Sequence, residues 1–189
     1  MGSGDMGATS GTGDRGDRLR LTRWNVTSGS NTQSRAAVVI QAGDHQWDGR
    51  AESPGPIAAL YRAVDAALAG VLSGHPRLLS YDVHAVSESP DSEGVVTVTV
   101  APPESAAGER AEGRFDGEAR SENIIAASVE AYVQAIDRLL GHETWAGATE
   151  AGGNRRVAKT KEAAARRQAR GVTLDEEAAE RTNVNWFER

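Results

Sequence analysis

The chain has 189 residues, a formal net charge of −6 at pH 7 and no cysteine. Its length allows one domain with tails, and the lack of cysteine excludes disulfides, thiol nucleophiles and cysteine-ligated metals. The negative charge argues against general nucleic-acid binding. No apolar run reaches the ~18 residues that a membrane span needs, and the polar, glycine-rich N-terminus lacks the apolar core of a signal peptide. The sequence therefore predicts a cytoplasmic protein.

The first half of the chain predicts three strands followed by one helix. Residues 1–17 carry almost no apolar side chains, so we expect a disordered N-terminal tail. Alternation of apolar and polar residues predicts strands over 19–26, 36–41 and 45–52. A helix is expected over 56–73, because Pro56 suits a first turn and apolar residues follow at helical spacing. Gly74 is its predicted C-terminal cap.

The second half repeats this order. Strands are expected over 79–85, 95–100 and 110–119. A helix is expected over 122–140, with Ser121 as its N-cap and Gly141 as its stop. The letters Ile-Ala-Ala that begin the first helix at Ile57 return in the second helix at Ile125. The sequence therefore predicts an α+β fold with two layers, built from two pseudo-repeated βββα units.

Two stretches at the predicted helix starts resemble a known family. Residues 53–59 read Ser-Pro-Gly-Pro-Ile-Ala-Ala, and residues 119–128 read Ala-Arg-Ser-Glu-Asn-Ile-Ile-Ala-Ala-Ser. Together with the strand at 81–86, they resemble the C-terminal regulatory and dimerisation domain of 2-isopropylmalate synthases, over residues 18–142. Ser53 and Ala119 depart from this pattern, because the family has glycine at both places and glycine tolerates positive φ.

The resemblance implies a homodimer and an effector site for a branched-chain amino acid, leucine first. Helix N-termini offer free N–H groups and a positive dipole end, which suit a carboxylate. The site residues expected on this basis are Gly55, Pro56, Ile57, Ala59, Leu60, Ser121, Asn123, Ile125 and Ala127. In the alternative interpretation, Ser121 is only a helix cap and the alanines only let the helices pack closely.

The chain lacks the features that the synthase reaction needs. A catalytic barrel takes ~250 residues, and the four histidines have no spacing that would place two imidazoles on one metal. We therefore expect a protein that is not an enzyme, with no cofactor and no metal site. By this interpretation, any catalytic synthase partner is a separate subunit.

The region 143–189 is predicted to be a linker followed by a basic helical tail. Residues 154–170 carry seven basic residues against one acid, and Trp186 with Phe187 lies near the end. Nucleic acid is an unlikely partner for this tail, because it lacks interleaved aromatic residues.

Two functions remain open. One is a standalone allosteric domain that senses leucine; the alternative is a dimeric scaffold that no longer senses a ligand and binds a partner through its basic tail.

Overall fold

The computed structural model describes residues 18–87 and 92–152, and it has the order of elements that the sequence predicts. The strands are β1 (Arg20–Thr27), β2 (Ser34–Ala42), β3 (His45–Ser53), β4 (Arg77–Ala85), β5 (Gly94–Ala101) and β6 (Phe115–Ser121). The long helices are α1 (Pro56–Leu72) and α2 (Ile124–Leu140). Three short helical turns complete the described elements: η1 (Gly108–Ala111) between β5 and β6, and η2 (Glu143–Trp145) and α3 (Ala148–Ala151) after α2. Among the described residues, no helix is long and apolar enough to cross a membrane.

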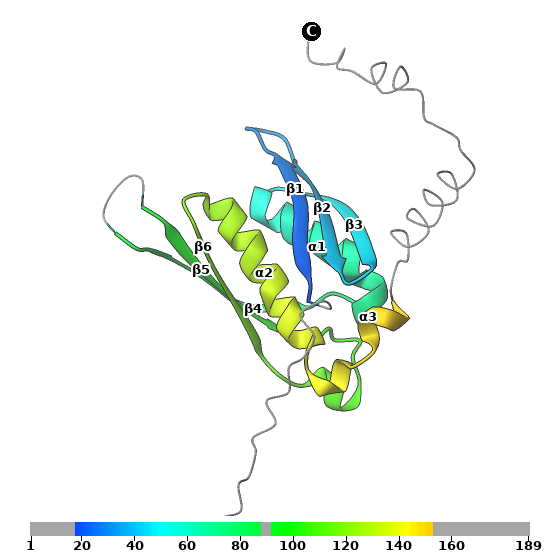
Figure 1. The fold of residues 1–189 in the computed structure, drawn as a ribbon. Helices are drawn as coiled ribbons and strands as arrows, with labels where there is room; N and C mark the ends of the chain where they lie inside the picture. Colours follow the sequence, from blue (N-terminus) through cyan, green and yellow to red (C-terminus); the bar gives the residue numbers. More distant parts are fainter. Residues whose placement is uncertain (1–17, 88–91, 153–189) are drawn as a thin grey trace, which may run out of the picture.

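Each half of the chain forms one antiparallel sheet covered by its own helix, so the predicted α+β fold of two βββα units is confirmed (Figure 1). The sheet orders are β1-β2-β3 and β4-β5-β6. In both sheets the central strand supplies alternate buried residues, such as Val38 and Ile40 in β2 and Val96 and Val98 in β5. These side chains face the helix, because alternate residues of a strand share one face.

A glycine in the third strand of each unit lets the helix approach closely. A Cβ atom at Gly49 of β3 would lie 2.7 Å from the Ala67 nitrogen, and one at Gly117 of β6 would lie 2.6 Å from the Ala135 nitrogen. Gly117 and Ala135 follow their counterparts in the first unit at the same offset as the repeated helix letters. The duplication therefore extends to the contact between helix and sheet.

The helix ends differ from the prediction by one or two residues. The left-handed residue that ends α1 is Ser73, with φ 55°, and not Gly74. The N-cap of α2 is Asn123 and not Ser121, which ends strand β6. Gly141 does follow the last residue of α2, although its φ of −74° is an ordinary helical value. An N-cap is the residue whose side-chain oxygen reaches the free N–H groups of the first turn, and both Ser121 and Asn123 carry such an oxygen.

Two segments were assigned wrongly from the sequence. The sixth strand begins at Phe115 instead of Arg110, and η1 occupies the preceding loop. Residues 143–152 do not behave as a linker, because Trp145 and Ala148 are buried against the core and the Trp47 indole donates to the Gly152 carbonyl oxygen (3.2 Å). The expected tails at 1–17 and 153–189 lie outside the described residues.

Candidate functional site

The two long helices run side by side in the same direction, so their starts lie at the same end of the molecule (Figure 1). The Tyr61 hydroxyl of α1 donates to the Ser128 carbonyl of α2 (3.2 Å), and one turn further the Tyr132 hydroxyl donates to Asp65 Oδ1 (2.7 Å). Because the contacting residues lie one turn later in both helices, the two helices run parallel. The structure thus brings together the two helix starts that the sequence assigns to one site.

The start of α1 has no side-chain cap. Gly55 is its N-cap, in an extended conformation with φ −118° and ψ 151°, and Pro56 is the first helical residue. A Cβ atom added at Gly55 would meet nothing within 4 Å. The positive end of the α1 dipole is therefore available to an anion, and the backbone beside it is open.

The start of α2 is capped by side chains. Asn123 Oδ1 accepts from the Ile125 and Ala126 N–H groups (3.0 and 3.3 Å), and Ser121 Oγ accepts from the Asn123 N–H (3.0 Å). Both side-chain oxygens, which are the atoms here that could accept from the ammonium group of an amino acid, are thus already hydrogen-bonded to the backbone. Ser121 Oγ keeps one lone pair for a further donor, whereas Asn123 Oδ1 already accepts two bonds and the Asn123 amide keeps only its NH₂ donors.

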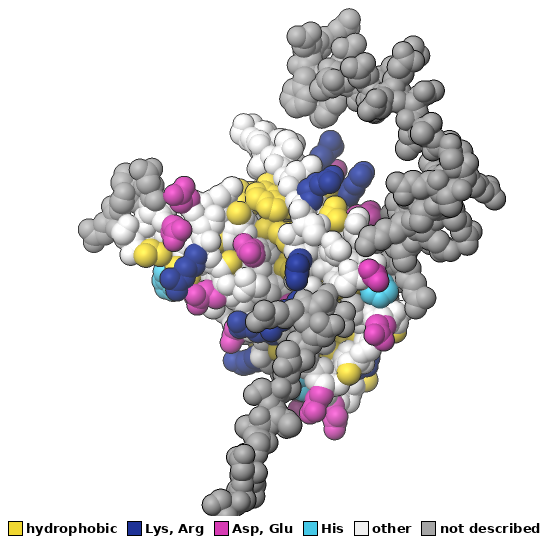
Figure 2. Space-filling model, viewed as in Figure 1, with side chains coloured by type: hydrophobic (Ala, Val, Ile, Leu, Met, Phe, Trp, Pro, Cys, Tyr) yellow, Lys and Arg dark blue, Asp and Glu magenta, His cyan; other side chains and the backbone are white. Residues whose placement is uncertain are grey.

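The apolar members of the expected site differ in their exposure. Ala59, Leu60 and Ala127 have no exposed surface, whereas Ile57 and Ile125 are partly buried. Figure 2 shows apolar side chains gathered over this end of the molecule, beside β1. Of the expected apolar site residues, the isoleucines are therefore the ones that reach the surface, and Ala59, Leu60 and Ala127 lie in the core.

Ser53 and Ala119 do not strain the backbone. Both end or lie within strands, β3 and β6, and their side chains are buried. Within the described ranges, Asn31 and Ser73 are the non-glycine residues with positive φ. The concern that these two positions need glycine for a left-handed conformation is therefore wrong for this chain.

All three tyrosines of the chain meet where the two units join, a feature that the sequence analysis missed. Tyr61 stacks on Tyr132 with ring centroids 4.1 Å apart, and Tyr81 of β4 contacts the edge of Tyr61 at 6.4 Å. The Tyr81 and Ser128 hydroxyls are 2.8 Å apart, and Ser128 donates its own proton to the Ile124 carbonyl (2.6 Å). Tyr81 is therefore the donor in the first pair.

Burial controls the ionisation of this tyrosine junction. It raises the pKa of the Asp65 carboxyl above its ordinary 3.8, while the hydrogen bond from Tyr132 and the nearby His75 lower it in part. Burial also raises the pKa of Tyr61 and of Tyr132, so both phenols stay protonated as donors. An acidic residue one turn beyond Tyr61 on the buried side of a helix was the sequence signal available for this junction.

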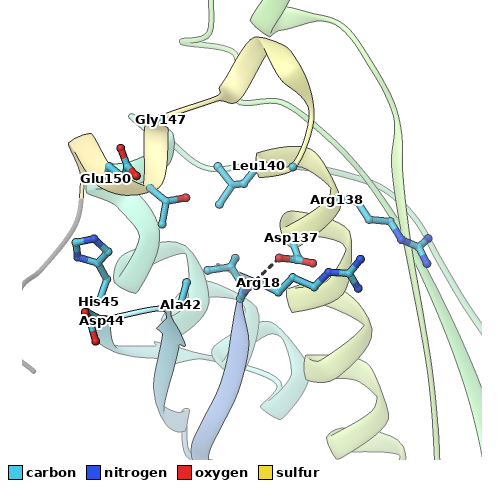
Figure 3. Close-up of a pocket in the computed structure, with 12 residues that line it drawn as sticks. Arg18, Ala42, Asp44, His45, Asp137, Arg138, Leu140, Gly147 and Glu150 are labelled. Carbon is cyan, nitrogen blue, oxygen red and sulfur yellow. Dashed lines mark hydrogen bonds between the residues drawn. The ribbon is translucent and has the colours of Figure 1, made fainter. Parts of the chain in front are cut away.

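A pocket of about 630 Å³ lies at the other end of α2 (Figure 3). It is bounded by the start of β1, the β2–β3 turn, the end of α2 and α3, and the Leu19 N–H donates to Asp137 Oδ1 inside it (2.8 Å). Its charged groups have both signs, with Arg18, Asp137 and Arg138 on one side and Asp44 and Glu150 on the other. None of the site residues expected from the sequence lines this pocket.

The fold and the site together define a class of protein: a duplicated βββα domain whose candidate ligand site is a pair of helix starts. Across residues 18–87 and 92–152, no group of three or more histidine or acidic side chains could hold a metal ion. Residues 7–140 match the family described as the LeuA allosteric (dimerisation) domain, and the chain belongs to that family. The family recognised from the two helix-start motifs is thereby confirmed.

The similar curated proteins are 2-isopropylmalate synthases. That of Salinibacter ruber is 31% identical over 158 residues, which cover 79% of this chain and 27% of the relative. Those of Nitrosococcus oceani and Nostoc sp. are 27% and 31% identical, covering 66% and 65% of this chain but 22% and 21% of the relatives. The chain thus spans about a quarter of the length of these relatives.

Proposed function

We propose that this domain is a dimeric amino-acid sensor that regulates a separate catalytic synthase subunit. The observation that carries the proposal is the pair of adjacent, parallel helix starts in a domain of the allosteric family, one of them uncapped. Since the chain corresponds to the regulatory part of its relatives, we expect no condensation of acetyl-CoA with a 2-oxo acid by this chain alone.

The proposed ligand is a branched-chain amino acid, leucine first and isoleucine second. Its carboxylate would lie at the open start of α1, near Gly55, Pro56 and Ile57, where the helix dipole is positive. Its ammonium group would use the remaining lone pair of Ser121 Oγ, next to Asn123, whose own oxygen caps the helix through two bonds. Its aliphatic side chain would contact the partly exposed isoleucines Ile57 and Ile125. The other proposed members, Ala59, Leu60 and Ala127, support this surface from the core.

A ligand in this position would touch both units at once. The units meet through the tyrosine junction, which lies one to two turns beyond the helix starts. A molecule that bridges Gly55 and Asn123 would favour the arrangement of α1 and α2 that fits it best, by its difference in affinity between arrangements. This is how binding at the helix starts would reach the rest of an assembly.

The test is a thermal-shift measurement of the wild type against the amino acids. Ligand at a hundred times its Kd stabilises the folded state by about 2.7 kcal/mol, so millimolar leucine is expected to raise the melting midpoint measurably. Gly55→Val should abolish that rise by crowding the start of α1. It is a clean probe, because Gly55 has an ordinary extended conformation with open space beside it.

Two controls accompany this test. Gly55→Val without ligand should melt near the wild type, and lysine should shift neither protein, because its charged end has no partner among Ile57 and Ile125. If none of the amino acids shifts the wild type, the sensor proposal fails. The dimeric scaffold would then be the better interpretation, since the capping oxygens of Ser121 and Asn123 would have only a structural role.

A further inference from the structure

Strand β4 carries apolar side chains on the face of its sheet that the fold normally buries. Leu78 and Val83 lie directly opposite Val100 and Val96 in the register with β5, and both valines have no exposed surface. Residues directly opposite one another in an antiparallel pair point to the same face. Leu78 and Val83 therefore face the side that carries α2, yet they are 47% and 44% exposed.

The exposure arises because α2 packs mainly on β5 and β6. Tyr81, which lies between Leu78 and Val83 on the same face, is partly buried through its contacts with Tyr61 and Ser128. The two flanking residues belong neither to the hydrophobic core nor to the residues packed against it. We call Leu78, Tyr81 and Val83 the β4 strip.

The same positions of the first unit are covered. The edge strands β1 and β4 both have a register shift after their second residue, so the equivalents of the β4 strip are Leu21, Trp24 and Val26. All three lie opposite buried residues of β2 and pack against the core. Strand β1 contacts both long helices, whereas α1 and α2 make little contact with β4. The β4 strip is therefore a face that the same fold covers in its other unit.

The largest apolar side chains outside the described ranges are those of Trp186 and Phe187. Every other phenylalanine, tyrosine and tryptophan of the chain is buried or partly buried. An aromatic side chain removes about 150–250 Å² from water when it is buried, and aromatic rings pack favourably against one another. A tyrosine ring flanked by two exposed aliphatic side chains is a surface that suits such a pair.

The chain is long enough to bring Trp186 to the β4 strip. Gly152, the last described residue, lies against the end of α1, since a Cβ atom there would be 2.6 Å from the Val71 Cα. Val83 follows Val71 by 12 residues, which span at most about 40 Å. Trp186 follows Gly152 by 34 residues, which span about 50 Å even as one continuous helix. Contact within one chain is therefore geometrically possible.

Charge and tethering both favour contact with the same chain. Residues 153–189 carry nine basic and six acidic residues, whereas the whole chain has a net charge of −6. The rest of the chain is therefore strongly negative and attracts this positive region. A tethered segment also has an effective concentration on the order of a millimolar, far above that of a second copy at micromolar protein.

We propose that the segment 183–189 docks on the β4 strip of its own chain, with Trp186 and Phe187 as its anchors. Docking removes the apolar surface of the strip and of both anchors from water, which stabilises the contact. The segment thereby takes the place over β4 that the helices leave open. This contact is independent of the proposed ligand and of the dimeric state.

The docked segment would be coupled to the start of α2. The Tyr81 hydroxyl donates to Ser128 Oγ, and Ser128 donates to the carbonyl of Ile124, the first residue of α2. An anchor packed on Tyr81 restricts its ring and, through these two hydrogen bonds, the first turn of α2. A partner that withdraws the segment would therefore free Tyr81 and uncover the strip at the same time.

The first experiment measures how fast a thiol on the strip reacts with a maleimide. The chain has no cysteine, so Val83→Cys and His84→Cys each introduce one thiol. His84 is the matched control, because it pairs with Val95 and so lies on the opposite face of β4. Each variant is compared with and without the double substitution Trp186→Ser and Phe187→Ser. If the strip is covered about nine-tenths of the time, this substitution speeds the reaction at position 83 about tenfold and leaves position 84 unchanged.

Two results of this experiment would overturn the proposal. One is an equal rate at position 83 with and without the anchors. The other is protection of position 83 that disappears on tenfold dilution, because a second copy would then be the cover. Circular dichroism establishes that the variants are folded.

A second measurement detects the contact directly and keeps both anchors. Glu188→Cys is combined with Val83→Cys or with His84→Cys, and a short bis-maleimide is added at micromolar protein. The pair 83 and 188 should link within one chain, giving a cross-linked peptide in protein that still runs at the 19.9 kDa chain mass. The pair 84 and 188 should link far less. Equal linking of the two pairs, or links that mainly join two chains, would count against docking on the same chain.

Discussion

The closest approach between helix and sheet gives the sharpest test of the duplicated fold. We expect Gly49→Ala and Gly117→Ala to destabilise the protein strongly and to a similar extent. The added methyl group at either position would lie within 2.7 Å of a helix nitrogen, and closer still to a carbonyl oxygen of the preceding turn. These are backbone atoms and cannot rotate away, so the helix must move from the sheet by about 1.5 Å to reach an ordinary contact distance.

The size of the effect follows from overpacking. Inserted methyl groups typically cost about 1–3 kcal/mol of folding stability. Because the methyl group here would clash with backbone atoms of the helix, we expect a loss at the upper end of this range, about 3 kcal/mol. For a chain of this size, each kcal/mol lowers the melting midpoint by about 2–4 °C, so we expect a fall of roughly 6–12 °C. Urea unfolding measures the same loss as a lower midpoint at constant slope.

The control is Gly55→Ala, whose added methyl group meets nothing. This variant should be close to neutral, since the restriction of the unfolded chain by alanine offsets its poorer fit to the N-cap position. If Gly49→Ala and Gly117→Ala melt like Gly55→Ala, the helices do not sit on the sheets as described. If only one of the two is destabilised, the two units are not equivalent in their packing.

Three further results are expected. Asp65 has a raised pKa in the fold, so the folded state binds more protons than the unfolded state just above pH 3.8, and its contribution to stability falls as pH rises through that window. The stability of the wild type relative to Asp65→Asn should therefore fall between acid and neutral pH in urea titrations, and a difference that grows with pH would contradict this. Asn123→Ala should cost about 1 kcal/mol in ligand-free protein through loss of the α2 cap; an equal or larger loss from Ser121→Ala would instead favour the serine as the cap. Trp145→Ala should cost about 3–5 kcal/mol in chemical unfolding, whereas a neutral result would restore residues 143–152 to the status of a linker.

The periodic features of the sequence were sufficient to predict the architecture of the fold. Alternation at Val96, Val98 and Val100 predicts a strand because one face of it must be buried, and the structure buries all three. The Ile-Ala-Ala letters shared by the two helices, together with the repeated order of elements, predict two equivalent units. These inferences succeed because residues two apart in a strand, or three and four apart in a helix, share one face, so the pattern that marks an element lies in nearby positions.

The site could be predicted only in part, because its members had to be placed by contacts between distant residues. The helix-start motifs indicate which residues flank α1 and α2, and the parallel packing of the helices brings the two starts to one end. The sequence could not separate Ile57 and Ile125, which reach the surface, from Ala59, Leu60 and Ala127, which do not. Exposure depends on how the two units pack, and local spacing carries no information about it.

By itself, then, the sequence determined the order of the strands and helices, the duplication and the family, all of which follow from local periodicity and short motifs. The tertiary structure decided how the units meet. It joined Tyr61, Tyr81 and Tyr132 from three separate elements, buried Trp145 beside the core and left Leu78 and Val83 of β4 exposed. Each of these depends on side chains that are far apart in sequence, and their pairing lowers the free energy only once both units have folded and packed together.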